Sequence, residues 1–228
     1  MKKFALLAAV LAVGLAVPGV AQAAAYTLFG SATYVSPGEA SNRAVQLVAD
    51  ATTGTYSGID FSVPAGLTIN SLNDLETDYD FTASSCGLGS PRFGIQLDGY
   101  SGTIFAYIGP PPSYTGCIPN MWTPTGNLLS PVSLVDTSQL PGGSFYDTWA
   151  AAQARYSGTT VTDIFLVSDN GPTGSQTVLI DNTDVNGTLY DYEPSSKEDC
   201  KNGGWQNFSS PPGPFKNQGE CVSYFTKH

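Results

Sequence analysis

The stretch Val161-Thr-Asp-Ile-Phe-Leu-Val-Ser168, followed by Thr177-Val-Leu-Ile-Asp-Asn-Thr-Asp-Val185 and then Asn186-Gly187, decides the fold. The first two segments are nearly continuous in apolar residues over the length of a strand, which predicts two central strands. Asn-Gly supplies the two positive φ angles of a type I′ turn, so a last strand is expected over residues 188–192. This part of the chain therefore predicts antiparallel β structure.

Shorter strand signals occupy the preceding part of the chain. Apolar and polar residues alternate, as around Ile59, Phe61 and Val63, and a period of two predicts a strand with one buried face. The segments with strand signals are residues 43–49, 59–63, 75–81, 93–97 and 104–108. We therefore predict a mainly β fold over residues 24–192, an antiparallel β-sandwich of the jelly-roll kind.

One short helix is expected within this β domain. Ser144 is a suitable N-cap, residues 150–152 are alanines, and Gly158 is a suitable end. We expect the helix to pack across the sandwich through Phe145 and Trp149. Residues 110–141 hold seven prolines and are expected to form a long ordered loop.

The four cysteines indicate disulfide bonds, because their number is even and the chain has an export signal. Three pairings are formally open, and the most economical one joins Cys86 to Cys117 and Cys200 to Cys221. A zinc site, the alternative use, would need histidine ligands that the sequence lacks.

Residues 1–23 have the parts of a secretory signal peptide. Positive Lys2 and Lys3 precede an apolar run, and small residues follow at 21–23. A retained membrane anchor is the alternative, which Gly14 and Pro18 disfavour because they interrupt a short apolar core. We predict a secreted protein, extracellular or periplasmic, with no membrane span in the mature chain.

The mature chain would be strongly acidic. The full chain has 9 basic and 19 acidic residues, a formal charge of -10, and cleavage would remove two of the basic ones and leave -12. An acidic surface repels phosphates, so nucleic acid is not an expected partner.

Residues 193–228 are predicted to form a linker and a small disulfide-stapled helical hairpin. About thirty residues bury too little apolar surface to fold unaided, so a Cys200–Cys221 bridge, worth roughly 3 kcal/mol, is the expected staple. The expected core of this module is Trp205, Phe208, Phe215, Tyr224 and Phe225.

Two motifs in this segment carry a resemblance. Cys200-Lys-Asn-Gly-Gly-Trp-Gln-Asn-Phe208 and Phe215-Lys-Asn-Gln-Gly-Glu-Cys-Val-Ser-Tyr224 resemble a short C-terminal module found on exported bacterial proteins. The resemblance implies a bacterial, exported protein and no particular activity.

A second, shorter resemblance concerns Val178-Leu-Ile-Asp181-Asn182, which is similar to a late strand of jelly-roll sandwiches that include carbohydrate-binding modules. It implies that Asp181 is the candidate ligand of a structural calcium ion, the one cofactor considered, with oxygen donors from nearby Asp and Asn residues. The alternative is that these residues make turns.

Catalytic side chains are scarce. The only histidine is His228, so a Ser-His-Asp or Cys-His arrangement has no general base. Glu76, Asp78 and Asp80 share one face of a strand and are the candidates for a carboxylate-only glycan-cleaving enzyme. The simpler interpretation is that they form the solvent face of that strand.

Aromatic and polar residues around the proline-rich loop are candidates for ligand binding. The five residues in question are Arg92, Tyr107, Tyr114, Asn120 and Trp122. Aromatic faces stack on sugars, while amide and charged groups bind hydroxyls. Trp122 is alternatively a lid over the core, and Arg92 alternatively forms an internal ion pair.

These observations favour a secreted, non-catalytic binding protein for glycan or cell-envelope material. The alternative is a structural or adhesive surface protein that acts through self-association, and the glycan-cleaving enzyme is the third hypothesis.

Overall fold

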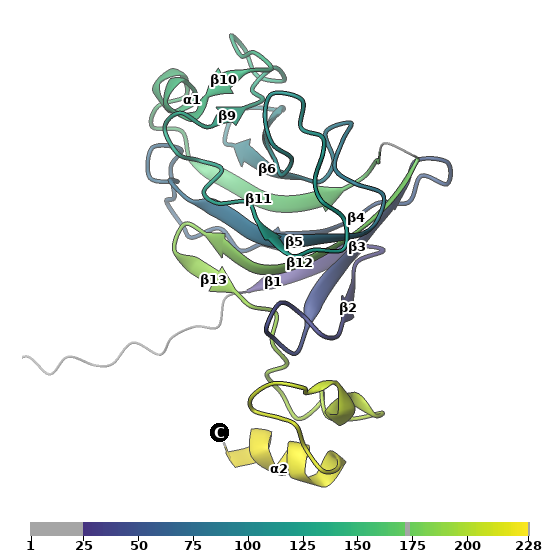
Figure 1. Ribbon diagram of the computed structural model, residues 1–228. Helices are drawn as coiled ribbons and strands as arrows, with labels where there is room; N and C mark the ends of the chain where they lie inside the picture. Colours follow the sequence, from purple (N-terminus) through teal and green to yellow (C-terminus); the bar gives the residue numbers. More distant parts are fainter. Residues whose placement is uncertain (1–24, 172–173, 228) are drawn as a thin grey trace, which may run out of the picture.

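The computed structural model describes residues 25–171 and 174–227, so the predicted signal peptide lies outside the described residues. Two antiparallel sheets, here sheet A and sheet B, face each other (Figure 1). Sheet A has the spatial order β1 (Tyr26–Gly30), β4 (Ser57–Phe61), β11 (Val161–Ser168), β6 (Arg92–Leu97) and β7 (Thr103–Tyr107). Sheet B has the order β2 (Thr33–Val35), β3 (Ala44–Asp50), β12 (Ser175–Val185), β5 (Leu75–Ala83) and β8 (Thr123–Pro124). The predicted antiparallel sandwich is confirmed.

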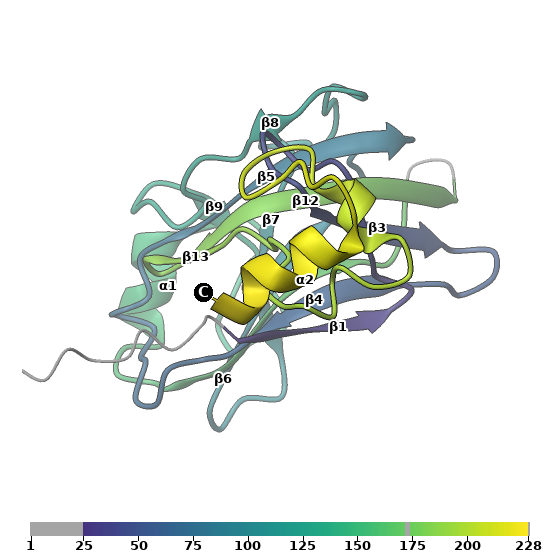
Figure 2. The ribbon, with the colours of Figure 1, turned by 90° about the horizontal axis from the view of Figure 1, so that it is seen from below.

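The two apolar segments are central, as predicted. β11 lies between β4 and β6, and β12 lies between β3 and β5. Along β11, Ile164 and Leu166 are fully buried, and Val178 and Ile180 of β12 are fully buried against them in one core. Figure 2 shows β1 and β4 on one side of the sandwich and β5 and β12 on the other.

The predicted turn after β12 is also confirmed. Asn186 and Gly187 have φ angles of 53° and 85°, and the chain returns as β13 (Thr188–Tyr190), which pairs with β12. The strand is shorter than the expected 188–192 because Tyr192 leaves the ladder. Its side chain is buried, and its hydroxyl donates to Thr183 Oγ1 at 2.7 Å.

The helix differs from the prediction at its start. α1 (Trp149–Arg155) is capped by Thr148, whose hydroxyl accepts from Ala151 N, and not by Ser144. The physical reason is that β10 (Asp147–Thr148) pairs with β9 (Leu134–Val135), which holds residue 148 extended. Trp149 is buried as expected, whereas Phe145 is 44% exposed and lies against other rings rather than in the core.

The proline-rich segment is irregular apart from β8 and β9. The Cys86–Cys117 disulfide ties it to the end of β5, and Ser85 Oγ donates to Cys117 O at 2.8 Å. Both cysteines are buried in the main core. The predicted clip of this long loop is therefore present.

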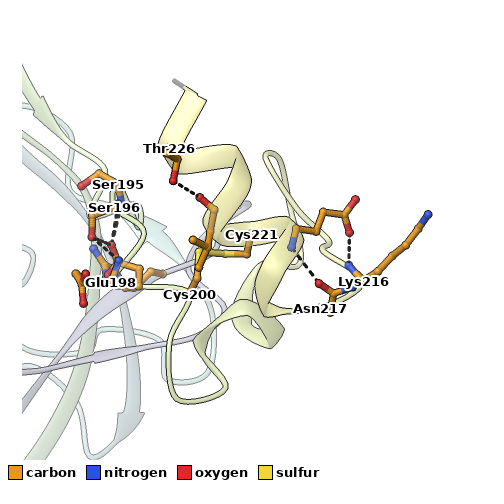
Figure 3. The surroundings of a disulfide bond; sticks show 12 residues. Ser195, Ser196, Glu198, Cys200, Lys216, Asn217, Cys221 and Thr226 are labelled. Carbon is orange, nitrogen blue, oxygen red and sulfur yellow. Dashed lines mark hydrogen bonds and ion pairs between the residues drawn. A yellow bond between two sulfur atoms is a disulfide. The ribbon is translucent and has the colours of Figure 1, made fainter.

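The C-terminal segment forms a small helical module below the sandwich in Figure 1. It contains a short 3₁₀ helix, η1 (Gly204–Asn207), and α2 (Gln218–Lys227). The predicted disulfide joins Cys221 of α2 to Cys200, which precedes η1 (Figure 3). Phe208 and the two cysteines are buried, while Trp205, Phe215 and Phe225 are partly buried around them. Tyr224 is 36% exposed and contacts Phe215 at the edge, so the core is smaller than expected.

Two residues before β3 hold this module against the sandwich. Asn42 is fully buried; its Nδ2 donates to Pro211 O at 3.0 Å, and its Oδ1 accepts from Ser210 N at 2.7 Å. Arg43 donates to Tyr192 O and pairs with Asp199 at 2.8 Å. Polar contacts thus dominate the junction. No helix within the described residues is long and apolar enough to cross a membrane.

Candidate functional site

A groove lies on the outer face of sheet A, beside the turn that joins β3 to β4. Its volume is about 650 Å³. It is lined by Phe29, Ala51, Gly54, Tyr56, Asp60, Asp163, Phe165, Val167, Asp169 and Asn170. The groove exists because β4 and β11 bury Ile59 and Leu166 on their inner face and turn Asp60 and Phe165 outward.

Two phenylalanine rings cover glycines across neighbouring strands. Phe29 pairs with Gly58, and its ring occupies the space that a side chain at position 58 would need. Phe165 pairs with Gly94, and its ring covers that glycine in the same way. The rings therefore lie along the sheet, each with one side on the backbone and partly exposed. Tyr56, 53% exposed, stands beside Phe29 with ring centroids 6.3 Å apart.

Two carboxyl groups meet in the groove. Asp60 and Asp163 lie on neighbouring strands, β4 and β11, where Asp60 stands opposite Phe165, two residues along from Asp163, and both line the groove. Burial, and then the adjacent Asp60, raise the pKa of Asp163 to about 6. Asp163 therefore holds a proton more strongly than an isolated aspartate would.

The predicted residue Arg92 lies beside this groove and forms the internal ion pair that was its alternative role. Its guanidinium donates to both oxygens of Asp169, at 2.8 and 2.6 Å, and lies 4.6 Å from the centre of the Phe105 ring. Asp169 lines the groove, so Arg92 neutralises that carboxylate.

The predicted residues Tyr107 and Tyr114 come together in a separate cleft of about 400 Å³ between the sheet edges and the proline-rich loop. Their ring centroids are 4.6 Å apart, and Phe145 covers Tyr107. Both are buried, with exposures of 8% and 6%. Tyr107 donates to Asp136 Oδ2 at 2.7 Å, whereas the buried Tyr114 hydroxyl has no hydrogen-bond partner among the residues that the structure describes.

The other two predicted ligand-binding residues lie outside both lining sets. Asn120 is exposed in the proline-rich loop, where its backbone N donates to Phe81 O at 2.9 Å. Trp122 is partly buried just before β8. The structure therefore brings together three of the five predicted residues, because Arg92 lies opposite Tyr107 in the β6–β7 pairing, although its guanidinium binds Asp169 beside the groove.

Asp181, the candidate calcium ligand, is fully buried at a bulge in β12. Its carboxylate accepts from Ser41 Oγ at 2.6 Å and from the backbone N of Glu39 and Asn182, both at 2.8 Å. Burial raises its pKa to about 6. Across residues 25–171 and 174–227, no three acidic, histidine or cysteine side chains form a group that could hold a metal ion, and calcium stays a prediction.

Glu76, Asp78 and Asp80 occupy the outer face of sheet B, each partly buried. A hydrogen bond with Asp78, and then burial, raise the pKa of Glu39 to about 7, and Asn182 Nδ2 donates to both carboxylates at 3.0 Å. Glycosidase carboxyl pairs stand at least about 5 Å apart to accommodate a substrate bond or water. In this structure the Asn182 amide bonds both the Glu39 and the Asp78 carboxylate, which suits a structural role for these two groups.

Comparison with known proteins adds no family to this description. No protein-family model matches the chain, and no curated protein sequence matches it. The two resemblances read from the sequence therefore stay predictions, and the groove is interpreted from its own residues.

Sequence reasoning missed the groove. Its rings come from β1 and β11, which are far apart in the chain and are brought together by β4. The available signal was the placement of Asp163 and Phe165 on one face of a strand, opposite Ile164 and Leu166.

Proposed function

We propose that this protein is a secreted, non-catalytic glycan-binding protein and that the groove on sheet A is its binding site. The observation that carries the proposal is the arrangement of Phe29, Tyr56 and Phe165 around one groove that also contains carboxylates. Two disulfide bonds are compatible with an oxidising, extracytoplasmic location.

The chemistry of the lining suits a sugar. A pyranose ring has an apolar face of C–H groups that packs on an aromatic ring, and hydroxyls at its edge that need acceptors and donors. Phe165 and Phe29 offer partly exposed rings, while Asp60 and Asn170 offer polar atoms at the same surface. Because the rings rest on strand backbone, little side-chain freedom is lost when a ligand stacks on them.

The groove is better suited than the cleft at the proline-rich loop. Tyr107 and Tyr114 pack on each other and on Phe145, and both are more than nine-tenths buried, so their faces are already covered by protein. Phe165 and Tyr56 keep surface available to a ligand.

The test is titration of the mature protein with a panel of oligosaccharides and cell-envelope polysaccharides, by calorimetry. Phe165→Ala should weaken binding at least about tenfold, the loss expected when one stacking contact is removed. The matched control is Trp122→Ala, which removes an aromatic side chain outside the groove and should leave affinity unchanged. Loss of binding in Trp122→Ala alone would move the site to the loop.

A second variant keeps the test valid if Phe165→Ala fails to fold. Ala51 is an exposed residue of the groove wall, so Ala51→Gln should obstruct the groove without touching its rings. It should weaken binding while the melting temperature stays within about 2 °C of the parent protein, as expected of a surface substitution. Absence of binding across the panel, with self-association in sedimentation, would replace this proposal with the adhesive alternative.

A further inference from the structure

Within the part of the chain that the structure describes, the Asp60–Asp163 pair has no cationic neighbour in the groove. Among the described residues, the groove lining contains no lysine or arginine, and the nearby Arg92 is engaged at both oxygens of Asp169. Asp60 is exposed and Asp163 partly so, which leaves the pair open to a ligand. The pair is therefore a site of unbalanced negative charge on an accessible surface.

Aromatic rings border the pair and share its preference for positive charge. Phe165 follows two residues after Asp163 on the same face of β11 and pairs with Asp60 across the ladder. Phe29 and Tyr56 belong to the same groove. The face of an aromatic ring carries negative electrostatic potential and attracts a cation. Rings and carboxylates together favour a positively charged, partly apolar ligand.

We infer that the glycan bound in this groove carries free amino groups, as in oligomers of an amino sugar that lack N-acetyl groups. An ammonium group has three N–H donors, enough to bond both Asp60 and Asp163. The sugar ring that carries it would stack on Phe165, next to the pair. The inference rests on the proposed function and names the class of its ligand.

A metal ion matches these residues less well. Calcium takes about six to eight oxygen ligands, whereas this pair offers two carboxyl groups bordered by rings. The pKa of Asp163, raised by burial and by Asp60, agrees with a pair that gains from a positive partner. In the free protein, a proton on Asp163 would take the place of the positively charged ligand group.

The experiment compares three oligosaccharides of equal length in calorimetric titration: glucosamine, N-acetylglucosamine and glucose oligomers. At pH 6.5 and low salt, the glucosamine oligomer should bind at least about tenfold more tightly than the other two, because it alone places a cation between the carboxylates. The preference should fall with added salt. Equal affinity for all three oligomers would overturn the inference and leave the proposed function standing.

The decisive variant is Asp60→Asn with Asp163→Asn. The double substitution removes the charge, keeps the side-chain shape, and relieves the repulsion between the two carboxylates, so the fold should be retained. It should abolish the preference for the amine while binding of the neutral oligomers persists. The matched control is Asp98→Asn, in the exposed turn between β6 and β7. A loss of preference in the control as large as that in the double variant would overturn the inference.

A lysine oligopeptide of equal charge separates the glycan from charge alone. It should bind more weakly than the glucosamine oligomer, and Phe165→Ala should affect it less. If the peptide bound as tightly and with the same dependence on Phe165, the ligand would be a cationic peptide and the inference would be wrong. If neither the oligosaccharides nor the peptide bound, both the inference and the proposed function would be wrong.

Discussion

In the sandwich, one apolar core runs between both sheets and includes fully buried residues such as Phe93 and Ile95. In the described part of the C-terminal module, residues 196–227, only Phe208 and two cysteines are buried. Both regions contain one disulfide bond. The sandwich is stabilised by a large core as well as by its disulfide, whereas the module has little besides its disulfide to stabilise it. The difference teaches that the same covalent link is supplementary in one region and essential in the other.

The largest expected effect comes from removing the module's disulfide. Closing a segment of 21 residues is worth about 3 kcal/mol in the chain-entropy model, more than so small a core can replace. Cys200→Ser with Cys221→Ser should therefore unfold α2, measured as loss of amide protection in hydrogen exchange. The free energy of unfolding of the sandwich should change by less than about 1 kcal/mol, since the core is untouched.

The matched comparison is Cys86→Ser with Cys117→Ser. This pair closes a longer segment, 31 residues, so its loss should destabilise the sandwich by about 3–4 kcal/mol. The sandwich should nevertheless remain folded at 25 °C because its core remains. A protected α2 in the first double variant, or an unfolded sandwich in the second, would contradict the comparison.

An intermediate effect is expected at the junction. Asn42→Ala removes the buried amide that bonds Pro211 and Ser210, which should weaken docking of the module by about 2 kcal/mol. Faster proteolytic cleavage within residues 193–196 would report the change. Asn207→Ala, at an exposed position of η1, is the control and should leave the cleavage rate unchanged. Equal rates in both variants would mean that Asn42 does not hold the module.

The smallest effect is a dependence on pH of opposite sign in the two regions. In the sandwich, burial raises the pKa of Asp181 from 3.8 to about 6, so the folded state binds the proton more strongly than the unfolded state. Its contribution is complete below pH 4 and is lost as pH rises to 6, and the free energy of unfolding should fall by about 1 kcal/mol. The full difference between the two pKa values would correspond to roughly 3 kcal/mol, of which only part is lost between pH 4 and 6; it already includes the three hydrogen bonds that lower the pKa.

At the junction, the pKa of Asp199 is lowered: burial raises it, but Ser196 and Arg43 together outweigh burial. Docking should therefore be stable above pH 4 and weaken as pH falls below it. Urea unfolding between pH 4 and 7 tests the sandwich, and Asp181→Asn should flatten its slope. A sandwich that gains stability between pH 4 and 6 would contradict the assignment to Asp181.

Local patterns predicted most of the fold. Alternation around Ile59 and Phe61 and the Asn186-Gly187 turn depend on neighbouring residues. The strand predicted over 59–63 formed two residues earlier, as Ser57–Phe61, and the β12–β13 hairpin formed at the predicted turn with a shorter last strand. The start of α1 was not predictable in this way. Its cap moved to Thr148 because that residue pairs with Leu134, a contact made through tertiary structure.

The candidate site was harder to predict than the fold. A groove depends on which strands become neighbours, and nothing local in β1 indicates that Phe29 will share a surface with Phe165. The disulfide pairs, by contrast, link cysteines close in the chain and were predicted correctly. Asp60 and Asp163 looked like ordinary solvent-facing aspartates until the register of β4 and β11 placed them together.

The positions of β11 and β12 bear on how the chain folds. Each is the middle strand of its sheet, yet both come after residue 160. Until they are in place, β4 and β6 have no common neighbour, and neither do β3 and β5. Most pairings therefore join distant segments, which makes folding slow and leaves strand edges open to other chains in the meantime. A chaperone that binds the first 160 residues would be protecting precursors of both sheets.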